Sequence, residues 1–407
     1  MKFNSNFYSV FILLISLISS TAFAQFVNNG TTIIIQNNAT VFVNGDFSNI
    51  SGSIVNLGNL TLTGNWSNND AQGAFNVVSS GNVNFTGQNQ TIGGSQPTFF
   101  PGVVLTGTGT GIKRLLIDAS INGRLNLTDR EFALDDKRLN VLNKNTDAIA
   151  LTTGFISTNS RGILYRNTNS ISDYLFPLGS KTSGSLRFRP VSLKVKDNLD
   201  NSFGVTFVNN DPSNEGFNRD QKRFDVNEVN PFYFHILDQN RGSSAADFSF
   251  YYDNPGDGNF NQLVNWIRFN LWEKAGISNP QPFMSTTNPE LNHMMTYSSM
   301  QTISSLPIAL ATITSNNDPI TFFNSFTPDG DGINDRWEIK NIDLFPENDL
   351  TILNRWGSEV LKVKGYTNGN AWDGLGINNG TYFYILKVNV NGESKLYKGF
   401  ITLLRND

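Results

Sequence analysis

The sequence predicts an almost entirely β-protein with three successive regions, and three observations support this fold class. Of the 407 residues, 12% are aromatic, including 32 phenylalanines, so there is enough apolar material for buried cores. Short runs that alternate apolar and polar residues recur along the chain, which is the pattern of a strand with one buried face. Asn, Ser and many of the 35 glycines stand between these runs and supply turns.

The absence of cysteine and the mild charge exclude several classes of site. Without cysteine the chain has no disulfide, no thiolate metal ligand and no Cys nucleophile. The formal net charge is −4 and no basic run occurs, so we expect no nucleic-acid partner.

Residues 1–24 are predicted to be a signal peptide. Lys2 supplies the positive start, 8–18 are apolar, and 22–24 (AFA) form a small-x-small cleavage site before Gln25. A membrane anchor is the alternative, but the apolar stretch is too short and polar residues follow it. No later segment approaches eighteen apolar residues, so we expect no transmembrane helix in the mature chain.

The region 25–150 is predicted to be a β-solenoid-like stack. The segment 41–45 (VFVNG) recurs at 60–64 (LTLTG) and 83–87 (VNFTG), and 125–128 (LNLT) is a fainter copy. The glycines of the first three copies are 19 and then 23 residues apart. Such short units cannot bury an apolar face alone, which favours stacking. A β-sandwich with similar hairpins is the alternative.

The region 151–317 is predicted to be a sandwich of antiparallel strands. The strands expected there are at 162–165, 188–195, 204–208, 232–237 and 248–252, and 253–258 (DNPGDG) is a turn cluster. The segment 262–274 fits either a helix or a strand.

The region 318–407 is predicted to be an immunoglobulin-like β-sandwich, after the polar linker 314–317. The expected strands are at 320–326, 336–340, 350–354, 359–364, 381–390 and 395–404. Asn391-Gly392 separates the last two, and this pair takes the positive φ values of a tight hairpin.

Five motifs in this last region carry a resemblance to a known family. They are 326–342 (FTPDGDGINDRWEIKNI), 350–360 (LTILNRWGSEV), 371–374 (AWDG), 379–388 (NGTYFYILKV) and 398–405 (KGFITLLR). In this order they resemble the gliding-motility-associated C-terminal domain of Bacteroidota, the type B sorting domain of the type IX secretion system. The sequence departs from the usual family pattern at Asp329, where Asn is usual, and at Asn378-Asn379, where Leu-Pro is frequent.

The resemblance implies Sec export, translocation across the outer membrane by the type IX machinery, an outer-membrane partner, and a location at the cell surface or outside the cell. The motif residues it assigns to sorting are Phe326, Pro328, Gly330, Asp331, Gly332, Asn334, Asp335, Trp337, Asn354, Arg355, Trp356, Gly357, Trp372, Asp373, Gly374, Gly380, Thr381, Tyr382, Lys398, Gly399 and Arg405. These residues also have plain structural roles: Gly357, Gly374 and Gly380 are expected in turns, and Trp356 and Trp372 in a small core. More loosely, 58–68 (GNLTLTGNWSN) resembles repeats of adhesin-like proteins of the same bacteria.

Asp329, Asp331, Asn334 and Asp335 form a candidate calcium loop. Alternating carboxylates and glycines let a chain curl and aim several oxygens at one hard cation. The twelfth position from Asp329 is Lys340 rather than Glu, so an EF-hand is excluded. A turn capped by its own side chains is the alternative.

The sequence gives little support for catalysis. His235 and His293 are the two histidines, they have no metal-ligand spacing, and His235 lies in an apolar run. Between 25 and 110 the charged residues are Asp46 and Asp70, which argues against acid–base chemistry on the repeats. A solvated turn is expected for Asp135-Asp136. A catalytic face or an exposed edge fits the cluster Lys113, Arg114, Arg124 and Arg130.

The leading hypothesis is therefore a non-enzymatic, adhesin-like or structural surface protein. The rival hypotheses are a carbohydrate-binding module, suggested by Trp66, Trp266 and Trp272, and a carbohydrate-active enzyme displayed at the surface. Surface polysaccharide is then an expected partner, and calcium is the only cofactor for which the sequence offers ligands.

Overall fold

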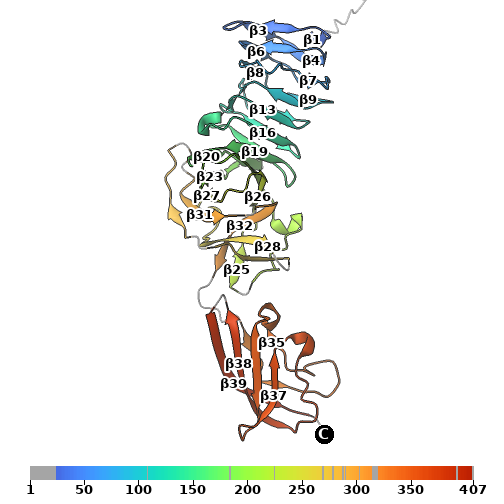
Figure 1. Ribbon diagram of the computed structural model, residues 1–407, viewed down its shortest axis with the longest axis vertical. Helices are drawn as coiled ribbons and strands as arrows, with labels where there is room; N and C mark the ends of the chain where they lie inside the picture. The colour runs from blue at the N-terminus through green and yellow to red at the C-terminus, as the bar shows by residue number, and fades with distance from the viewer. Residues whose placement is uncertain are drawn as a thin grey trace, which may run out of the picture. The chain divides into compact units, whose positions relative to one another are not determined.

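The computed structural model describes residues 24–405 except 108, 183–184, 224, 268–269, 277–278, 287, 289, 302, 314–319 and 391–392. The all-β prediction is confirmed: the described residues form 39 strands and four short 3-10 helices, with no α-helix (Figure 1). The predicted signal peptide (Ala24 apart), linker 314–317 and turn Asn391-Gly392 lie outside the described residues. The boundaries predicted at residues 150 and 317 stay predictions.

The chain folds into two compact units, which are described separately. The first takes the described residues up to 210 with 232–257 and 281–307, and the second takes 211–231, 258–280 and 308–407.

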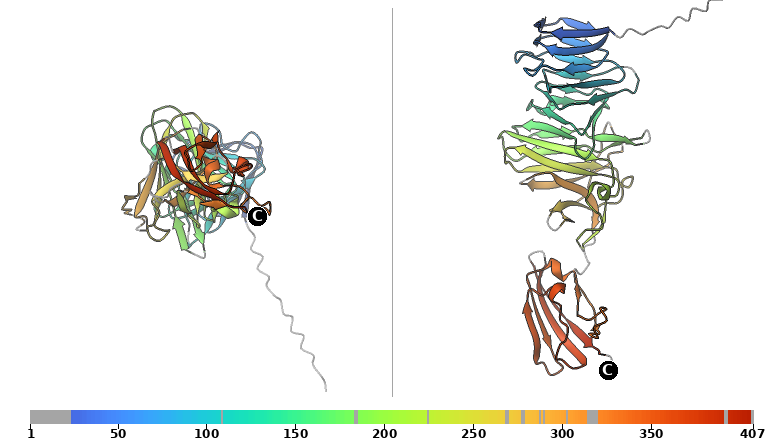
Figure 2. Two further views of the ribbon diagram at one scale, coloured as in Figure 1. Left: turned by 90° about the horizontal axis from the view of Figure 1, so that it is seen from below. Right: turned by 90° about the vertical axis from the view of Figure 1, so that its right-hand side faces the viewer.

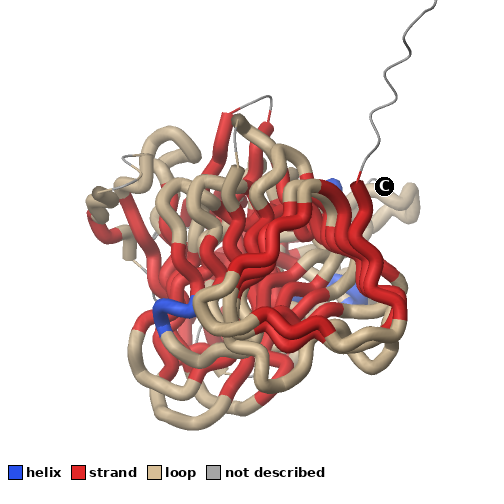
Figure 3. Tube along the Cα trace, turned by 90° about the horizontal axis from the view of Figure 1, so that it is seen from above, coloured by secondary structure: helices blue, strands red, loops and turns tan. Residues whose placement is uncertain are grey.

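The predicted β-solenoid is confirmed in the first unit, where about seven coils stack. Three parallel sheets run along the stack, and their strands overlie one another from coil to coil (Figures 1 and 3). The first sheet is β1 (Ala24–Asn29), β4 (Gly45–Ser51), β7 (Trp66–Asn68), β9 (Gln90–Gly94), β12 (Ile112–Leu115), β15 (Glu131–Asp135) and β18 (Phe155–Thr158). The second is β3 (Thr40–Val43), β6 (Asn59–Leu62), β8 (Asn82–Phe85), β11 (Val103–Leu105), β14 (Leu125–Asn126) and β17 (Ile149–Ala150). The third begins with β10 (Thr98–Phe100), β13 (Ala119–Ile121), β16 (Arg138–Val141) and β19 (Ile163–Thr168), and a small sheet pairs β2 (Ile33–Ile35) with β5 (Ile54–Asn56).

The repeats recognised in the sequence are successive rungs of the second sheet. Val41 pairs with Leu60, and Leu60 pairs with Val83, so the three copies stack in register. Their apolar positions point inward and are buried at Leu60, Leu62, Val83 and Phe85. A further rung, β11, pairs with both β8 and β14 and was not predicted from the sequence.

Two kinds of side-chain stack fill the first coils. The rings of Phe47 and Trp66 lie 5.0 Å apart at 13°, and Phe26 stacks on Phe47 at the same distance. Nearby, the buried amides of Asn28, Asn49 and Asn68 bond one another at 2.9 and 3.2 Å. Each rung thus places the same side-chain type over its neighbour, which satisfies polar groups inside the stack.

A glycine corner explains why the repeats end in glycine. A Cβ on Gly64 would overlap the Gly45 backbone, and one on Gly87 would overlap Thr63 O. Gly107, at the same corner of the next coil, has a φ of +130° and would meet Gly87 O. Only glycine lets these turns stack at strand spacing.

Antiparallel strands follow the coils, as predicted for the middle region. Strand β19 pairs in parallel with β16 on one side and antiparallel with β24 (Asn201–Val208) on the other, and β26 (Phe234–Arg241) follows β24. A second sheet has the order β20 (Asp173–Phe176), β23 (Val191–Val195), β27 (Ala246–Tyr252), β31 (His293–Met300) and β30 (Gln281–Pro282), and β21 (Gly179–Thr182) pairs with β22 (Ser185–Phe188). Phe203 of β24 meets Phe248 of β27 edge to face at 6.0 Å, so the two sheets share a core.

In the second unit, the segment 262–274 forms a hairpin, so its helical alternative is wrong. Strands β28 (Gln262–Ile267) and β29 (Leu271–Lys274) pair antiparallel, with Trp266 opposite Trp272. Strand β32 (Leu306–Ile313) pairs antiparallel with both β28 and β25 (Val226–Val229). The β-branched and aromatic side chains of 262–274 pack better on a pleated surface than on a helix.

The C-terminal domain has its own core under a five-stranded sheet. The sheet order is β34 (Ser325–Phe326), β39 (Glu393–Leu403), β38 (Gly380–Val390), β36 (Asn348–Leu353) and β37 (Glu359–Lys364), and β33 (Thr321–Phe322) pairs with β35 (Ile339–Lys340) (Figure 2, right). The 3-10 helices are η1 (Thr146–Ala148) and η2 (Pro212–Glu215) in the earlier regions, and η3 (Ile342–Leu344) and η4 (Asn368–Asn370) here. Each of the six predicted segments contains a strand, and β38 and β39 pair antiparallel from Gly380↔Leu403 to Val390↔Glu393, as the predicted hairpin requires.

Candidate functional site

Two motif tryptophans are joined at the centre of the C-terminal core. Trp337 is fully buried; its indole Nε1 donates to Phe323 O at 2.6 Å and its backbone N donates to Trp372 O at 2.8 Å. The hydroxyl of Tyr366 donates to Trp337 O at 2.5 Å and accepts from Trp372 N at 2.8 Å. Tyr366, whose buried hydroxyl links both motifs, lies outside the motifs and was not predicted as a site residue.

The Trp372-Asp373-Gly374 motif forms a turn packed on the last strand. Gly374 has a φ of +65°, and a Cβ there would overlap Leu403 and approach Phe326. The Asp373 carboxylate caps the turn by accepting from Leu375 N at 3.0 Å. The prediction of a turn glycine is confirmed here, and core packing is the second reason for it.

The chain end ties this turn down. The Arg405 guanidinium donates to Gly374 O at 2.5 Å and to Ile377 O at 2.5 Å. Asn379, one of the positions that departs from the family pattern, exchanges two bonds with the Arg405 backbone at 2.9 and 3.1 Å. Arg405 therefore has a structural role that its charge alone did not predict.

The Asn354-Arg355-Trp356-Gly357 motif is a rigid turn that exposes its tryptophan. The Asn354 side chain accepts from Trp356 N at 3.0 Å and from Ser358 N at 2.9 Å, and Gly357 has a φ of +83°. Trp356 is 74% exposed, so the prediction that it anchors the core is wrong, whereas that prediction is confirmed for Trp372. The Arg355 guanidinium carbon lies 4.2 Å from the Trp356 ring centroid.

The remaining motif residues fall on both faces of the sheet. Tyr382 is buried and donates to Asn378 O at 2.7 Å, and Phe326 packs 5.3 Å from the Trp372 ring. Gly399 lies under Tyr384, because a Cβ there would lie 2.6 Å from Tyr384 Cζ. Gly380 has a φ of +155°, and Thr381 and Lys398 are exposed. Pro328 leads into the acidic loop and is half-buried.

The acidic loop brings three of its four predicted ligands together. Carboxylate oxygens of Asp329, Asp331 and Asp335 lie within 4.8 Å of one another. The three could hold one cation, since hard cations prefer oxygen ligands. Asn334 has a φ of +56° and supplies a backbone oxygen that accepts from Thr327 N at 2.8 Å.

Hydrogen bonds within the loop compete with a cation. The Asp335 oxygens accept from Gly330 N at 2.6 Å and Gly332 N at 2.8 Å, and these bonds lower the pKa of Asp335. Asp329 accepts from Asp331 N at 3.3 Å, and Asp331 accepts from Ile333 N at 2.7 Å. Amides of the loop therefore take up part of the carboxylate lone pairs, and calcium would use the remaining ones.

Two of the four predicted cationic residues, Lys113 and Arg130, are buried at the glycine corner and do not form an exposed face. Lys113 is buried; it bonds Gln90 Oε1 at 2.6 Å and also Gly87 O, and burial followed by repulsion from Arg130 lowers its pKa to about 8. Arg130 is buried and donates to Gly107 O and Gly109 O. Both side chains therefore satisfy carbonyls of the glycine corner.

The other charged residues of the coils pair or cap turns. Arg114 pairs with Asp135, and Asp136 is exposed and pairs with Lys137 at 2.8 Å, as expected for a solvated turn. The two acids of the first coils accept backbone N–H groups: Asp46 from Asn65 at 2.7 Å and Asp70 from Gly52 at 2.8 Å. Arg124 lies 3.8 Å from Asp147 on the surface.

A buried polar cluster in the middle region was not found from the sequence. Arg189 forms two bonds to Asp257 at 2.5 and 2.7 Å, and Tyr233 donates to the same carboxylate at 2.8 Å. His235 bonds Arg189 O at 3.0 Å, and burial lowers its pKa to about 4, so it is neutral at pH 7. These partners satisfy one another inside the sandwich, which agrees with the packed histidine expected there.

The tryptophans that suggested carbohydrate binding do not form an exposed platform. Trp66 and Trp272 are buried, at 1% and 0% exposure, and Trp266 is partly buried against Trp272 at 5.5 Å. Sugar rings stack on exposed aromatic faces, so the suggestion from Trp66 and Trp272 is wrong.

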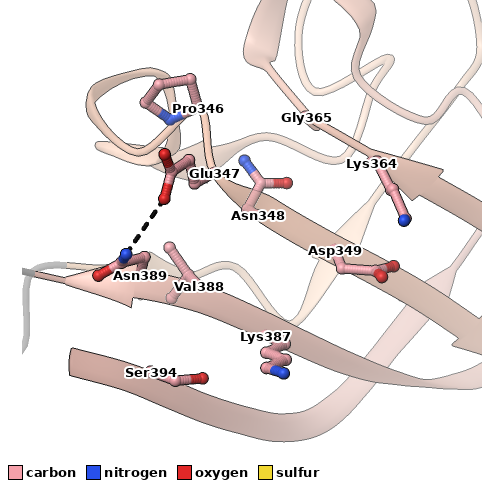
Figure 4. Close-up of a pocket in the computed structure, with 10 residues that line it drawn as sticks. All are labelled: Pro346, Glu347, Asn348, Asp349, Lys364, Gly365, Lys387, Val388, Asn389 and Ser394. Atoms are coloured by element: carbon pink, nitrogen blue, oxygen red, sulfur yellow. Dashed lines mark hydrogen bonds between the residues drawn. The ribbon is translucent and has the colours of Figure 1, made fainter. Parts of the chain in front are cut away.

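A shallow polar pocket of about 500 Å³ lies at one end of the five-stranded sheet (Figure 4). Asp349 stands between Lys364 and Lys387, which are its partners on the two neighbouring strands. The Asp349 Oδ1 atom is buried without a hydrogen-bond partner, and Asn389 donates to Glu347 at 3.1 Å beside it. The pocket therefore carries both charge signs.

The comparisons identify the C-terminal domain. Residues 320–403 match the family described as CHU_C Type IX secretion signal domain. The resemblance on the motif residues is therefore confirmed: the match supports export of the chain as a cargo of the type IX secretion system, to the cell surface or the medium. Neither the curated proteins nor the solved structures give a match. Among the described residues, no helix is long and apolar enough to cross a membrane.

Proposed function

We propose that this chain is a non-enzymatic surface protein, an adhesin-like or structural component, which the type IX system exports and which an outer-membrane partner receives. The observation that carries the proposal is the use of charge in the coils. Lys113 and Arg130 donate hydrogen bonds to backbone carbonyls of the glycine corner, and Asp46 and Asp70 accept them from backbone amides. The exposed positions on the coils carry few charges; Asn and Thr are frequent there, beside exposed apolar side chains such as Phe42 and Val77, and these residues suit contact with other surfaces.

A gene deletion tests the proposal. We expect the deleted strain to lose attachment, gliding or biofilm formation, and the full chain to restore it. A chain that lacks 25–150 but keeps 1–24 and 151–407 is expected to be exported without restoring the phenotype. Unchanged attachment, gliding and biofilm in the deleted strain would contradict the proposal.

The rival functions are separated by two further measurements on the purified protein. A glycan array that shows specific binding would favour a carbohydrate-binding module. Release of products from a polysaccharide panel would favour an enzyme, and the variant Asp257→Asn would then test the buried middle cluster.

A further inference from the structure

The outward face of the five-stranded sheet in the C-terminal domain carries an exposed apolar row. Phe383 of β38 lies opposite Phe400 of β39, and Leu353 of β36 lies opposite Phe383 on its other side. The two phenylalanines are 47% and 49% exposed, whereas their neighbours Tyr382, Tyr384 and Ile401 are buried in the core. A row of large apolar side chains across three strands at the surface needs an explanation beyond folding.

Three lysines lie on one side of this row, on the same face. Lys398 lies opposite Ile385 in the next outward rung, and Lys387 and Lys364 follow, one on each side of Asp349. Within the described part of the domain, none of these three lysines has an ion pair within 4.0 Å. The face therefore has an apolar row with more lysines than carboxylates on one side of it, since Lys364, Lys387 and Lys398 lie there with Asp349.

The tryptophan turn lies at the end of the sheet where the apolar row crosses it. The turn 354–358 joins Leu353 to Glu359, which pair with each other across β36 and β37. Trp356 is held there by the Asn354 cap, so it is exposed in one defined conformation. Arg355, stacked on it, has no ion pair among the described residues.

The motif residues separate into two groups on this evidence. Trp337, Trp372, Gly374, Gly399 and Arg405 have packing or hydrogen-bonding roles in the fold. Trp356 and Lys398 are exposed and have no such role, and Lys398 lies on the face of the apolar row. Folding leaves these exposed motif residues unexplained.

We propose that this docking face, made of Leu353, Trp356, Phe383, Phe400, Lys387 and Lys398, is the surface by which a protein of the type IX machinery binds the domain. The inference rests on export by that system. Trp and Arg are among the residues that dominate binding energy when a partner pocket covers them, and Phe is enriched at the cores of protein interfaces. The charge on the face requires a partner whose apolar pocket is edged with carboxylates, which would also speed encounter.

A protein partner fits this face better than an anionic sugar or a lipid headgroup. Anions need the lysines alone, whereas Phe383, Phe400 and Leu353 offer a contiguous apolar surface that only an apolar partner can cover. If the partner is a protein, substitutions of the apolar residues should impair export; if it is an anion, only substitutions of the lysines should.

The test compares variants of the full chain expressed in the native bacterium. The double variant Phe383→Thr/Phe400→Thr keeps strand-forming residues and removes the apolar row. We expect the exported fraction to fall roughly tenfold or more, with accumulation in the periplasm, as loss of two hot-spot side chains predicts. Leu375→Ser, at an exposed leucine in a loop of the same domain, is the matched control and is expected to be exported normally.

Further variants keep the outcome unambiguous. Hydrogen exchange of 320–403 in each purified chain must match the wild type, and Trp356→Ala gives a second variant if the double variant is unstable. Normal export of both would overturn the proposal, and so would export with loss of surface retention. A defect confined to Lys387→Glu/Lys398→Glu would also overturn it, in favour of an anionic sugar or lipid. Export of a chain that lacks 318–407 would instead refute the export route itself.

Discussion

The coils of the first unit and the C-terminal domain are both β-structures, but they distribute their stabilising contacts differently. In the coils each contact has copies: Leu60 stacks on Val83, and the donors Gln90 and Lys113 each satisfy carbonyls of the preceding coil's corner. In the C-terminal domain a single Trp337 meets Phe323 O, Trp372 O and Tyr366 at once. Removing one stabilising contact in the coils should therefore destabilise only the neighbouring coils, because each repeat contacts only its neighbours. Removing the contacts of Trp337 should destabilise the whole small domain.

The largest expected effect comes from Trp337→Ala. Removing a fully buried tryptophan is expected to cost about 4 kcal/mol of unfolding free energy in the C-terminal domain. Hydrogen exchange of the full chain should show lost protection throughout 320–403 and unchanged protection in the coils.

The matched control is Trp356→Ala in the same domain. Because Trp356 is exposed, its removal is expected to change stability by less than about 0.5 kcal/mol. A loss as large as that of Trp337→Ala would contradict the assignment of Trp356 to binding.

The next effect, on the middle region, depends on pH. Below the unfolded pKa of about 6.5 the unfolded chain protonates His235, but the folded chain does so only near its lowered pKa of about 4. The contribution of neutral His235 to the unfolding free energy is therefore fully present above pH 6.5. It falls by roughly 3 kcal/mol as the pH drops to 4. Urea unfolding at pH 7 and at pH 4.5 should show a smaller loss of unfolding free energy for His235→Gln than for the wild type.

A smaller and local effect is expected for Asn49→Ala in the coils. The change leaves Asn28 Nδ2 without its partner and removes one of the two donors to Asn68 Oδ1, which keeps Asp70 N, at a cost of about 2 kcal/mol. Exchange should increase in β1, β4 and β7 only, and the exposed Asn29→Ala should change it little. If protection from hydrogen exchange fell across all the coils, destabilisation in the coils would not be local, and the contrast with the C-terminal domain would be wrong.

The smallest effect concerns the acidic loop. EDTA is expected to leave exchange in 327–337 unchanged, because backbone amides already occupy the Asp335 carboxylate. A loss of protection that calcium restores, with heat in a calcium titration, would instead make the loop a calcium site. Asp331→Asn should then abolish the heat and Asp373→Asn should not.

The stacked coils could be predicted because each rung has a short local sequence pattern. The rungs at 41–45, 60–64 and 83–87 were found because each combines inward–outward alternation with a corner glycine. The rung at Val103–Leu105 was missed although it has the same pattern: its central residue is apolar, as in 41–45, and Gly107 follows at the corner position.

In the candidate site, the motifs were found and the burial of individual side chains was not. Trp356 and Trp372 both stand in short turns before glycine, yet one is exposed and the other lies in the core. Likewise Lys113 and Arg114 are adjacent, and only Lys113 is buried. Adjacent strand residues face opposite sides, and only the neighbouring strands decide which side is covered.

By itself, the sequence determined the β class, the stacked repeats, the order of the regions and the type IX secretion domain, because alternation, turn residues and motif order are local properties. Only the tertiary structure decided which charges hold the glycine corner, that Tyr366 joins two motifs, and that Trp356 with Phe383 and Phe400 is left outside. These depend on which strands become neighbours, and residues as distant as Trp337 and Trp372 meet only after the chain has closed its sheets.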